Sequence, residues 1–122
     1  MNSQEFKFSI ATATLDLSSL KENPSLLIHY IPEEILKALK QFIFDQLQNK
    51  DGAPNPTDFK ITQFEFNESN ESGKFRMNFQ IDRQFCCADS TACSSDYMDF
   101  SFSLSATQLL AKGSFFDWTL TN

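Results

Sequence analysis

The sequence predicts an α+β fold, in which an antiparallel meander sheet of about five strands packs on one long helix. The first observation behind this prediction is a set of three segments, at residues 75–81, 100–104 and 116–120, in which apolar and polar residues alternate. Such strands have one apolar and one polar face, which is typical of antiparallel sheets and excludes a parallel sheet covered on both faces.

The second observation is a helical pattern of apolar residues between residues 32 and 49. The full chain has 122 residues, enough to bury a core without disulfides or metals. We therefore expect a single α+β domain over residues 1–122.

The first strand is expected where Phe6, Phe8 and Ile10 alternate with polar residues. The apolar parity reverses at Ala13, and a β-bulge near residue 11 or 12 accounts for such a reversal. A polar turn should follow over residues 18–24, because this stretch is rich in polar residues and ends in a proline.

The run SLLIHYI, at residues 25–31, favours a short helix over a strand, because Asn23 and Pro24 precede it. Pro32 breaks this run and suits the first position of the long helix, expected over residues 32–49. Glu33 and Glu34 complement the positive end of that helix. Its apolar stripe consists of Ile35, Leu36, Leu39, Phe42, Ile43 and Leu47.

The remainder predicts four strands joined by short connections. A turn-rich loop at residues 49–58 leads to a strand at 59–66, whose parity slips near Gln63. The polar run NESNESG then marks a hairpin loop into a strand at 74–85. The run FCCADSTACSSDYMD is expected to be a long connection to a strand at 98–106. Lys112 and Gly113 should then turn the chain into a last strand at 114–121.

The expected core joins the helix to the apolar sheet face. It consists of Leu36, Leu39, Phe42, Ile43, Phe75, Phe79, Phe100, Phe102, Phe116 and Trp118. The resulting order β-α-β-β-β-β is similar to the cystatin-like arrangement, a sheet wrapped on one long helix. The inhibitory hairpin of that family carries a Gln-x-Val-x-Gly motif, and this chain has no valine. Protease inhibition is therefore not implied. With two helices, the chain would also resemble the start of a helix-grip, ligand-binding fold, although the long C-terminal helix of that fold is missing.

The formal net charge of −6 argues against a nucleic-acid partner, because an acidic surface repels the phosphate backbone. The N-terminal residues lack the basic and apolar regions of a secretory signal, and the longest apolar run, at residues 26–31, is too short to cross a bilayer. We therefore expect a soluble, cytoplasmic protein with no membrane contact.

Three cysteines, Cys86, Cys87 and Cys93, form a candidate redox cluster. Their spacing does not match the paired ligands of a zinc site, and a cytosolic setting argues against a lasting disulfide between Cys93 and either of the others. The alternative is that one cysteine faces the core and the other two have no role. We expect no structural metal and no obligatory disulfide.

The remaining titratable residues predict no catalytic constellation, and hence no enzyme. Asp82, Asp89, Asp96 and Asp99 lack the register of a calcium loop. His29, the only histidine, is expected at a helix end, bonded to the backbone. Glu65, Glu68 and Glu71 straddle a strand end and its loop, so they do not form an acid–base pair. No cofactor is expected, because the chain has three glycines and no phosphate-binding loop.

These observations predict a non-catalytic interaction or assembly domain. Ser101, Ser103 and Ser105 would form a flat, weakly hydrated strip, and Phe115 on the last strand would point outward beside it. We expect a homodimer or a protein partner to bind this part of the sheet. The alternative is a small-molecule binder that holds an apolar ligand in a pocket between the helix and the Phe-rich sheet face.

Overall fold

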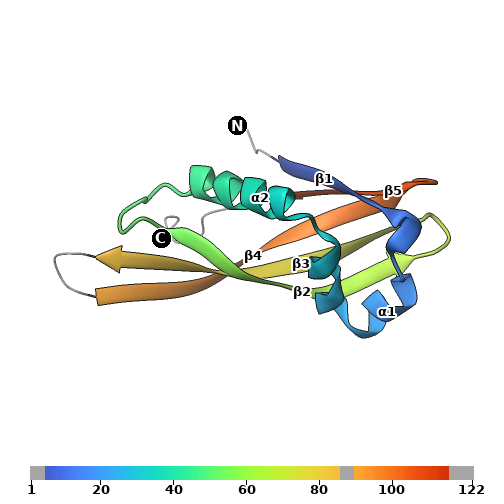
Figure 1. Cartoon of the computed structure of the whole chain (residues 1–122), viewed down its shortest axis with the longest axis horizontal. Helices are drawn as coiled ribbons and strands as arrows, with labels where there is room; N and C mark the ends of the chain where they lie inside the picture. The colour runs from blue at the N-terminus through green and yellow to red at the C-terminus, as the bar shows by residue number, and fades with distance from the viewer. Residues whose placement is uncertain (1–4, 86–89, 116–122) are drawn as a thin grey trace.

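The computed structural model describes residues 5–85 and 90–115. Its five strands form one sheet in the order β1-β5-β4-β3-β2, and every neighbouring pair is antiparallel. The strands are β1 (Glu5–Ala11), β2 (Asn55–Asn67), β3 (Ser72–Phe85), β4 (Ser90–Leu104) and β5 (Gln108–Ser114). The α+β fold with an antiparallel sheet is thus confirmed (Figure 1).

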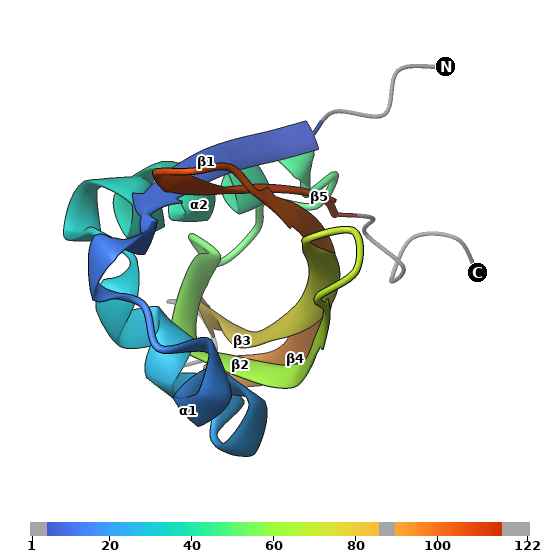
Figure 2. The same cartoon turned by 90° about the vertical axis from the view of Figure 1, so that its right-hand side faces the viewer.

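The helical segments all lie between β1 and β2, which are the two edges of the sheet. They therefore cross one face of the sheet and leave the other face uncovered by the described residues (Figure 2). The segments are η1 (Thr12–Thr14), α1 (Leu17–Glu22), η2 (Pro24–Tyr30) and α2 (Glu33–Gln46).

Helix α1 was expected to be a turn. It forms because the Asp16 carboxylate caps it, accepting hydrogen bonds from the backbone N–H groups of Ser18 (3.1 Å) and Ser19 (3.4 Å). The Ser19 hydroxyl also donates to Asp16 at 2.8 Å. These hydrogen bonds lower the pKa of Asp16, and the bond from the Ser19 side chain has the largest effect.

The short helix at the run SLLIHYI is confirmed as the 3₁₀ helix η2, and Pro32 separates it from α2. Pro32 caps α2 from just outside rather than occupying its first helical position. The helix ends at Gln46, three residues before the expected end, because Leu47 is already extended. Leu39 and Ile43 face the sheet from α2, and the ring of Phe42 packs on Phe6 of β1 at 5.6 Å.

The parity reversal at Ala13 comes from the end of β1, not from the expected bulge: the strand stops at Ala11 and residues 12–14 form η1. The expected slip near Gln63 is confirmed, because the register of β2 on β3 shifts between Thr62 and Glu65. Gln63 has a positive φ of 56° there, as some bulges require. A second shift near Asp58 was not expected.

The prediction of a long connection after residue 85 is wrong. Residues 90–97 belong to β4, which pairs with β3 as far as Phe85 opposite Ser90. The polar composition of this stretch hides it, because residues 90–96 show no alternation of large apolar and polar residues. The strands of this hairpin extend to one end of the sheet (Figure 1).

The last strand was also misplaced. The chain turns at residues 105–107, where the Ser105 N–H donates to the Gln108 carbonyl at 2.8 Å. Lys112 and Gly113 lie within β5 rather than in a turn. The pattern was hard to recognise because two of its inward positions hold only Ala111 and Gly113. At Gly113 a Cβ atom would lie 2.8 Å from the Phe100 ring, so a larger residue does not fit.

Phenylalanine rings dominate the core between sheet and helices. Phe75 stacks on Phe100 with ring centroids 5.1 Å apart, and Phe8 meets Phe100 edge-on at 5.6 Å. Of the expected core residues, Leu39, Ile43, Phe75, Phe79, Phe100 and Phe102 are buried, and Leu36 and Phe42 are partly buried. Phe116 and Trp118 lie outside the described residues.

Candidate functional site: the open face of the sheet

The uncovered face of the sheet, which we call the open face, carries the side chains whose parity is opposite to that of the core. On β3 and β4, for example, Arg76 and Asp99 alternate with buried Phe75 and Phe100. The antiparallel registers place these side chains in rows that cross the sheet. One row contains Lys7, Lys112, Ser101, Lys74 and Glu65. The row beside it contains Glu5, Ser114, Asp99, Arg76 and Thr62.

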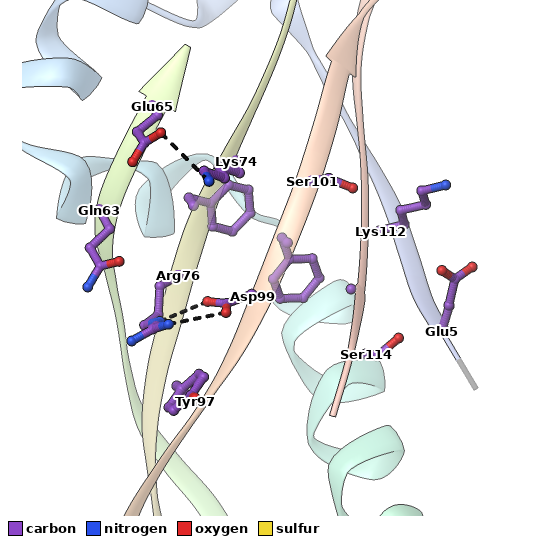
Figure 3. Close-up of a pocket in the computed structure, with 13 residues that line it drawn as sticks. Glu5, Gln63, Glu65, Lys74, Arg76, Tyr97, Asp99, Ser101, Lys112 and Ser114 are labelled. Atoms are coloured by element: carbon purple, nitrogen blue, oxygen red, sulfur yellow. Dashed lines mark hydrogen bonds and ion pairs between the residues drawn. The ribbon is translucent and has the colours of Figure 1, made fainter. Parts of the chain in front are cut away.

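Two hollows on this face are lined by residues of four or more strands, and a smaller third one lies by the β2–β3 turn. The first, the charged hollow, has a volume of about 550 Å³ and is lined by charged side chains from all five strands. Its polar lining residues are Glu5, Gln63, Glu65, Lys74, Arg76, Tyr97, Asp99, Ser101, Lys112 and Ser114 (Figure 3).

Arg76 organises the charged hollow. Its guanidinium donates to both carboxylate oxygens of Asp99, at 2.8 and 3.2 Å, and its carbon lies 4.0 Å from the centroid of the Tyr97 ring. The hydrogen bond to Asp99 raises the pKa of Arg76. A bidentate pair stacked on an aromatic ring holds the guanidinium in one orientation. Figure 3 shows the three side chains together on β3 and β4.

The β2 bulge sets the edge of the charged hollow. Because the register shifts between Thr62 and Glu65, Glu65 lies opposite Lys74, and their charged atoms are 3.9 Å apart. Both side chains are about two-thirds exposed, so this ion pair contributes little to stability. Both groups are therefore accessible to a ligand.

The second hollow, the serine hollow, has a volume of about 770 Å³ and lies over β1, β5, β4 and β3. Its outward-facing residues are Lys7, Ser9, Ser72, Ser101, Ser103, Leu110 and Lys112. Leu110 is 46 % exposed, and it and Tyr97 are the two exposed large hydrophobic residues in the described part of the chain. An exposed hydrophobic residue thus lines each hollow: Tyr97 the charged hollow and Leu110 the serine hollow.

Of the four residues predicted to form an interaction surface, only Ser101 and Ser103 lie on the open face. Ser101 and Ser103 line the serine hollow. Ser105 lies in the β4–β5 turn, where its hydroxyl accepts from the Gln108 N–H at 3.1 Å. The expectation that Phe115 points outward is wrong: Phe115 is 5 % exposed and packs on Phe79 with centroids 5.7 Å apart. Phe115 follows β5 with the parity of Ala111 and Gly113, so it belongs to the core face.

Cys93 lies on β4 as an exposed, free thiol, opposite Asp82 of β3. Its sulfur donates to the Gln80 amide oxygen at 3.3 Å. Hydrogen bonding to Asp82, then partial desolvation and the charge of that carboxylate, raise the pKa of the thiol. Cys86 and Cys87 lie outside the described residues, so the redox cluster stays a prediction.

The other sequence candidates do not converge. Asp82 faces Cys93 and Asp99 faces Arg76, while Asp96 lies opposite Phe79; Asp89 is outside the described residues. Within residues 5–85 and 90–115, no three metal-ligating side chains come together. His29 lies at the end of η2 as expected, but its imidazole is exposed and makes no hydrogen bond with the described residues. Glu68 and Glu71 lie in the β2–β3 turn, away from any partner acid.

The prediction that the chain is not an enzyme is wrong, because the assumption behind it does not hold. It rested on the absence of a readable constellation. The charged hollow nevertheless brings carboxylate, ammonium, guanidinium and phenol groups from separate strands into one cavity. Sequence spacing could not show this, because Glu65, Arg76 and Asp99 meet only through the strand registers.

Sequence reasoning also missed Lys7, Tyr97, Leu110 and Lys112 as residues of the open face. A signal was present for Lys7, which lies between Phe6 and Phe8, but not for Lys112, which lies between Ala111 and Gly113. No protein family model, curated protein or solved structure matches this chain. Among the described residues, no helix is long and apolar enough to span a membrane.

Proposed function

We propose that this chain is a protein-interaction domain that binds a protein partner, or a second copy of itself, through the open face. One observation carries the proposal: the helices cover one face, while both described hollows and both exposed large hydrophobic residues lie on the other. Interfaces are typically built from such a combination of apolar contacts, arginine and aromatic residues.

The charges of the open face support this choice. Half of the ten basic residues of an acidic chain carry side chains on it. These five residues are Lys7, Lys60, Lys74, Arg76 and Lys112. Glu5, Glu65 and Asp99 lie on the same face, and Lys74 and Arg76 pair with two of them. The open face is therefore much less negative than the rest of this acidic chain, so an acidic partner is repelled least there.

Two finer proposals accompany this one. We propose a cytoplasmic location, which the exposed free thiol of Cys93 supports, because reducing compartments keep such thiols free. We also propose a cystatin-like arrangement, supported by the sheet that wraps around α2; it implies no protease inhibition.

The test compares association by three forms of the full chain: wild type, Leu110→Glu, and Ala38→Glu. Leu110 lies on the open face, and Ala38 is exposed on α2, so the second variant is a control of matched charge. Light scattering over a concentration series measures self-association, and cross-linking in the native host followed by purification measures partner binding. We expect Leu110→Glu to abolish whichever association the wild type shows, while Ala38→Glu retains it. Equal association by all three forms would contradict the proposal.

A further inference from the structure

Two lysines face each other across the first strand pair of the open face. Lys7 on β1 is the direct register partner of Lys112 on β5. Directly opposed residues of antiparallel strands have Cβ atoms about 4.5–5.5 Å apart, and like-charged residues in directly opposite positions destabilise the pair. Neither ammonium group forms an ion pair with a described residue. Such a pair is unusual in a chain with 16 acidic and 10 basic residues.

Hydrogen-bond donors surround this lysine pair in the serine hollow. Ser9, Ser101 and Ser103 line it, and their hydroxyls make no hydrogen bond with described residues. Ser101 lies directly opposite Lys112 on β4, and Ser9 lies two residues from Lys7 on the same strand face. Two positive charges and at least two free hydroxyls therefore face one cavity of about 770 Å³.

We propose that the serine hollow binds one phosphate monoester group, with Lys7 and Lys112 as its charge partners and Ser9 and Ser101 as hydroxyl donors. A phosphate monoester carries a charge of about −1.5 to −2 at neutral pH and three acceptor oxygens. One such group neutralises the two opposed ammonium groups and relieves their repulsion. A single carboxylate carries half of that charge and fewer acceptors.

The neighbouring residues limit the size of the ligand. Glu5 lies one row from Lys7, and Glu65 and Asp99 border the charged hollow. A continuous polyanion such as nucleic acid would run past these carboxylates and be repelled. Leu110 offers the organic part of the ester an apolar contact, since it is 46 % exposed in the same hollow.

The phosphate could be borne by a side chain of the protein partner or by a free small molecule. The first source rests on the proposed function, and the second does not. Both sources would bind through the lysine pair, so a substitution in the site cannot distinguish them. They are distinguished by comparing the affinities of different phosphate ligands.

The experiment is an NMR titration of the isotope-labelled full chain with inorganic phosphate, with a peptide of neutral residues carrying one phosphoserine, and with the same peptide carrying aspartate. The site variant is Lys7→Gln with Lys112→Gln. The control variant is Lys37→Gln with Lys40→Gln on α2, which removes the same charge from the opposite side of the molecule.

We expect inorganic phosphate and the phosphopeptide to shift the amide signals of Lys7, Ser101 and Lys112 in the wild type and the control. The site variant should bind at least about tenfold more weakly, as the loss of a charge-assisted hydrogen bond predicts. Tighter binding of the phosphopeptide than of phosphate indicates the partner-borne source, and equal binding indicates a free ligand.

Equal binding of the aspartate peptide, or phosphate shifts that persist in the site variant, would overturn the proposal. Folding of the site variant is checked by its thermal midpoint without ligand, which should not fall, because the substitution removes a repulsion. Loss of phosphate binding alone leaves the proposed function standing. That function is tested separately, by the association of Leu110→Glu and Ala38→Glu.

Discussion

The thiol of Cys93 is exposed, and the carboxylate of Asp82 lies directly opposite it on the neighbouring strand. Hydrogen bonding to this carboxylate, with its charge, raises the pKa of the thiol, so less thiolate is present at neutral pH. Exposure alone suggests a reactive cysteine, and the neighbouring acid opposes this.

Replacing Asp82 by asparagine should therefore speed the alkylation of Cys93 near neutral pH, because the pKa of the thiol falls toward its ordinary value and the thiolate fraction rises. The rate is measured by mass spectrometry in a Cys86→Ser, Cys87→Ser background. Asp45→Asn, an exposed residue of α2, serves as the control. An unchanged rate in Asp82→Asn would show that Asp82 does not set the pKa of this thiol.

The elements of the sheet are held together by ring contacts between strands. Phe100 of β4 contacts Phe75 of β3 and Phe8 of β1, so this one side chain links three strands of the sheet. Gly113 of β5 lies so close to the same ring that a Cβ atom would not fit between them.

Phe100→Ala should lower the free energy of unfolding by about 3–5 kcal/mol, the usual cost of removing a buried phenylalanine. Leu110→Ala on the exposed face of β5 should change it by less than about 0.5 kcal/mol. Urea denaturation of both variants beside the wild type gives the two values. Similar losses in both would mean that the two faces of the sheet are assigned incorrectly.

Elements with strong patterns were predictable from the sequence, and those with small or polar inward residues were not. Helix α2, η2, β3 and the β2 bulge at Gln63 follow from apolar spacing, proline and parity. Helix α1 depends on the Asp16 cap, and β5 on Ala111 and Gly113, neither of which gives a hydrophobic signal. The first half of β4 is polar even where it pairs with buried residues of β3, since Ser94 and Asp96 lie opposite Ile81 and Phe79.

For the whole molecule, the distinctive feature is the pairing of β1 with β5, whose paired residues are 97 or more positions apart along the chain. It adds residues of β1 to both hollows, since Glu5 reaches the charged hollow and Lys7 reaches Lys112 only through this pairing. Ser101 and Ser103 of the open face were predictable from their alternation, whereas Ser72 was expected in a hairpin loop. The charged residues beside them were not, because parity within one strand does not tell which strands are neighbours.

The strand order can be tested with a disulfide. In a chain whose native cysteines are replaced by serine, Ser9→Cys with Leu110→Cys should form a disulfide on mild oxidation, because these residues are direct partners on β1 and β5. The control pair, Ser9→Cys with Asn67→Cys, joins the two opposite edges of the sheet and should stay reduced. Mass spectrometry distinguishes the outcomes, and a bridge in the control pair would refute the order.

The same pairing has a consequence for the time course of biosynthesis. A ribosome releases β1 first, and its only partner in the described sheet, β5, about a hundred residues later. At a typical elongation rate of about 5–20 residues per second, the apolar residues of β1 wait for several seconds without a neighbouring strand. During that interval Phe6 can pack on Phe42 of α2, and Phe8 on Phe100 once β4 has emerged, but the backbone of β1 has no strand to pair with. Co-translational completion of the sheet is therefore delayed until the last strand emerges, and nascent chains stalled before Gln108 would expose the edges of β1 and β4 that β5 pairs with in the complete sheet.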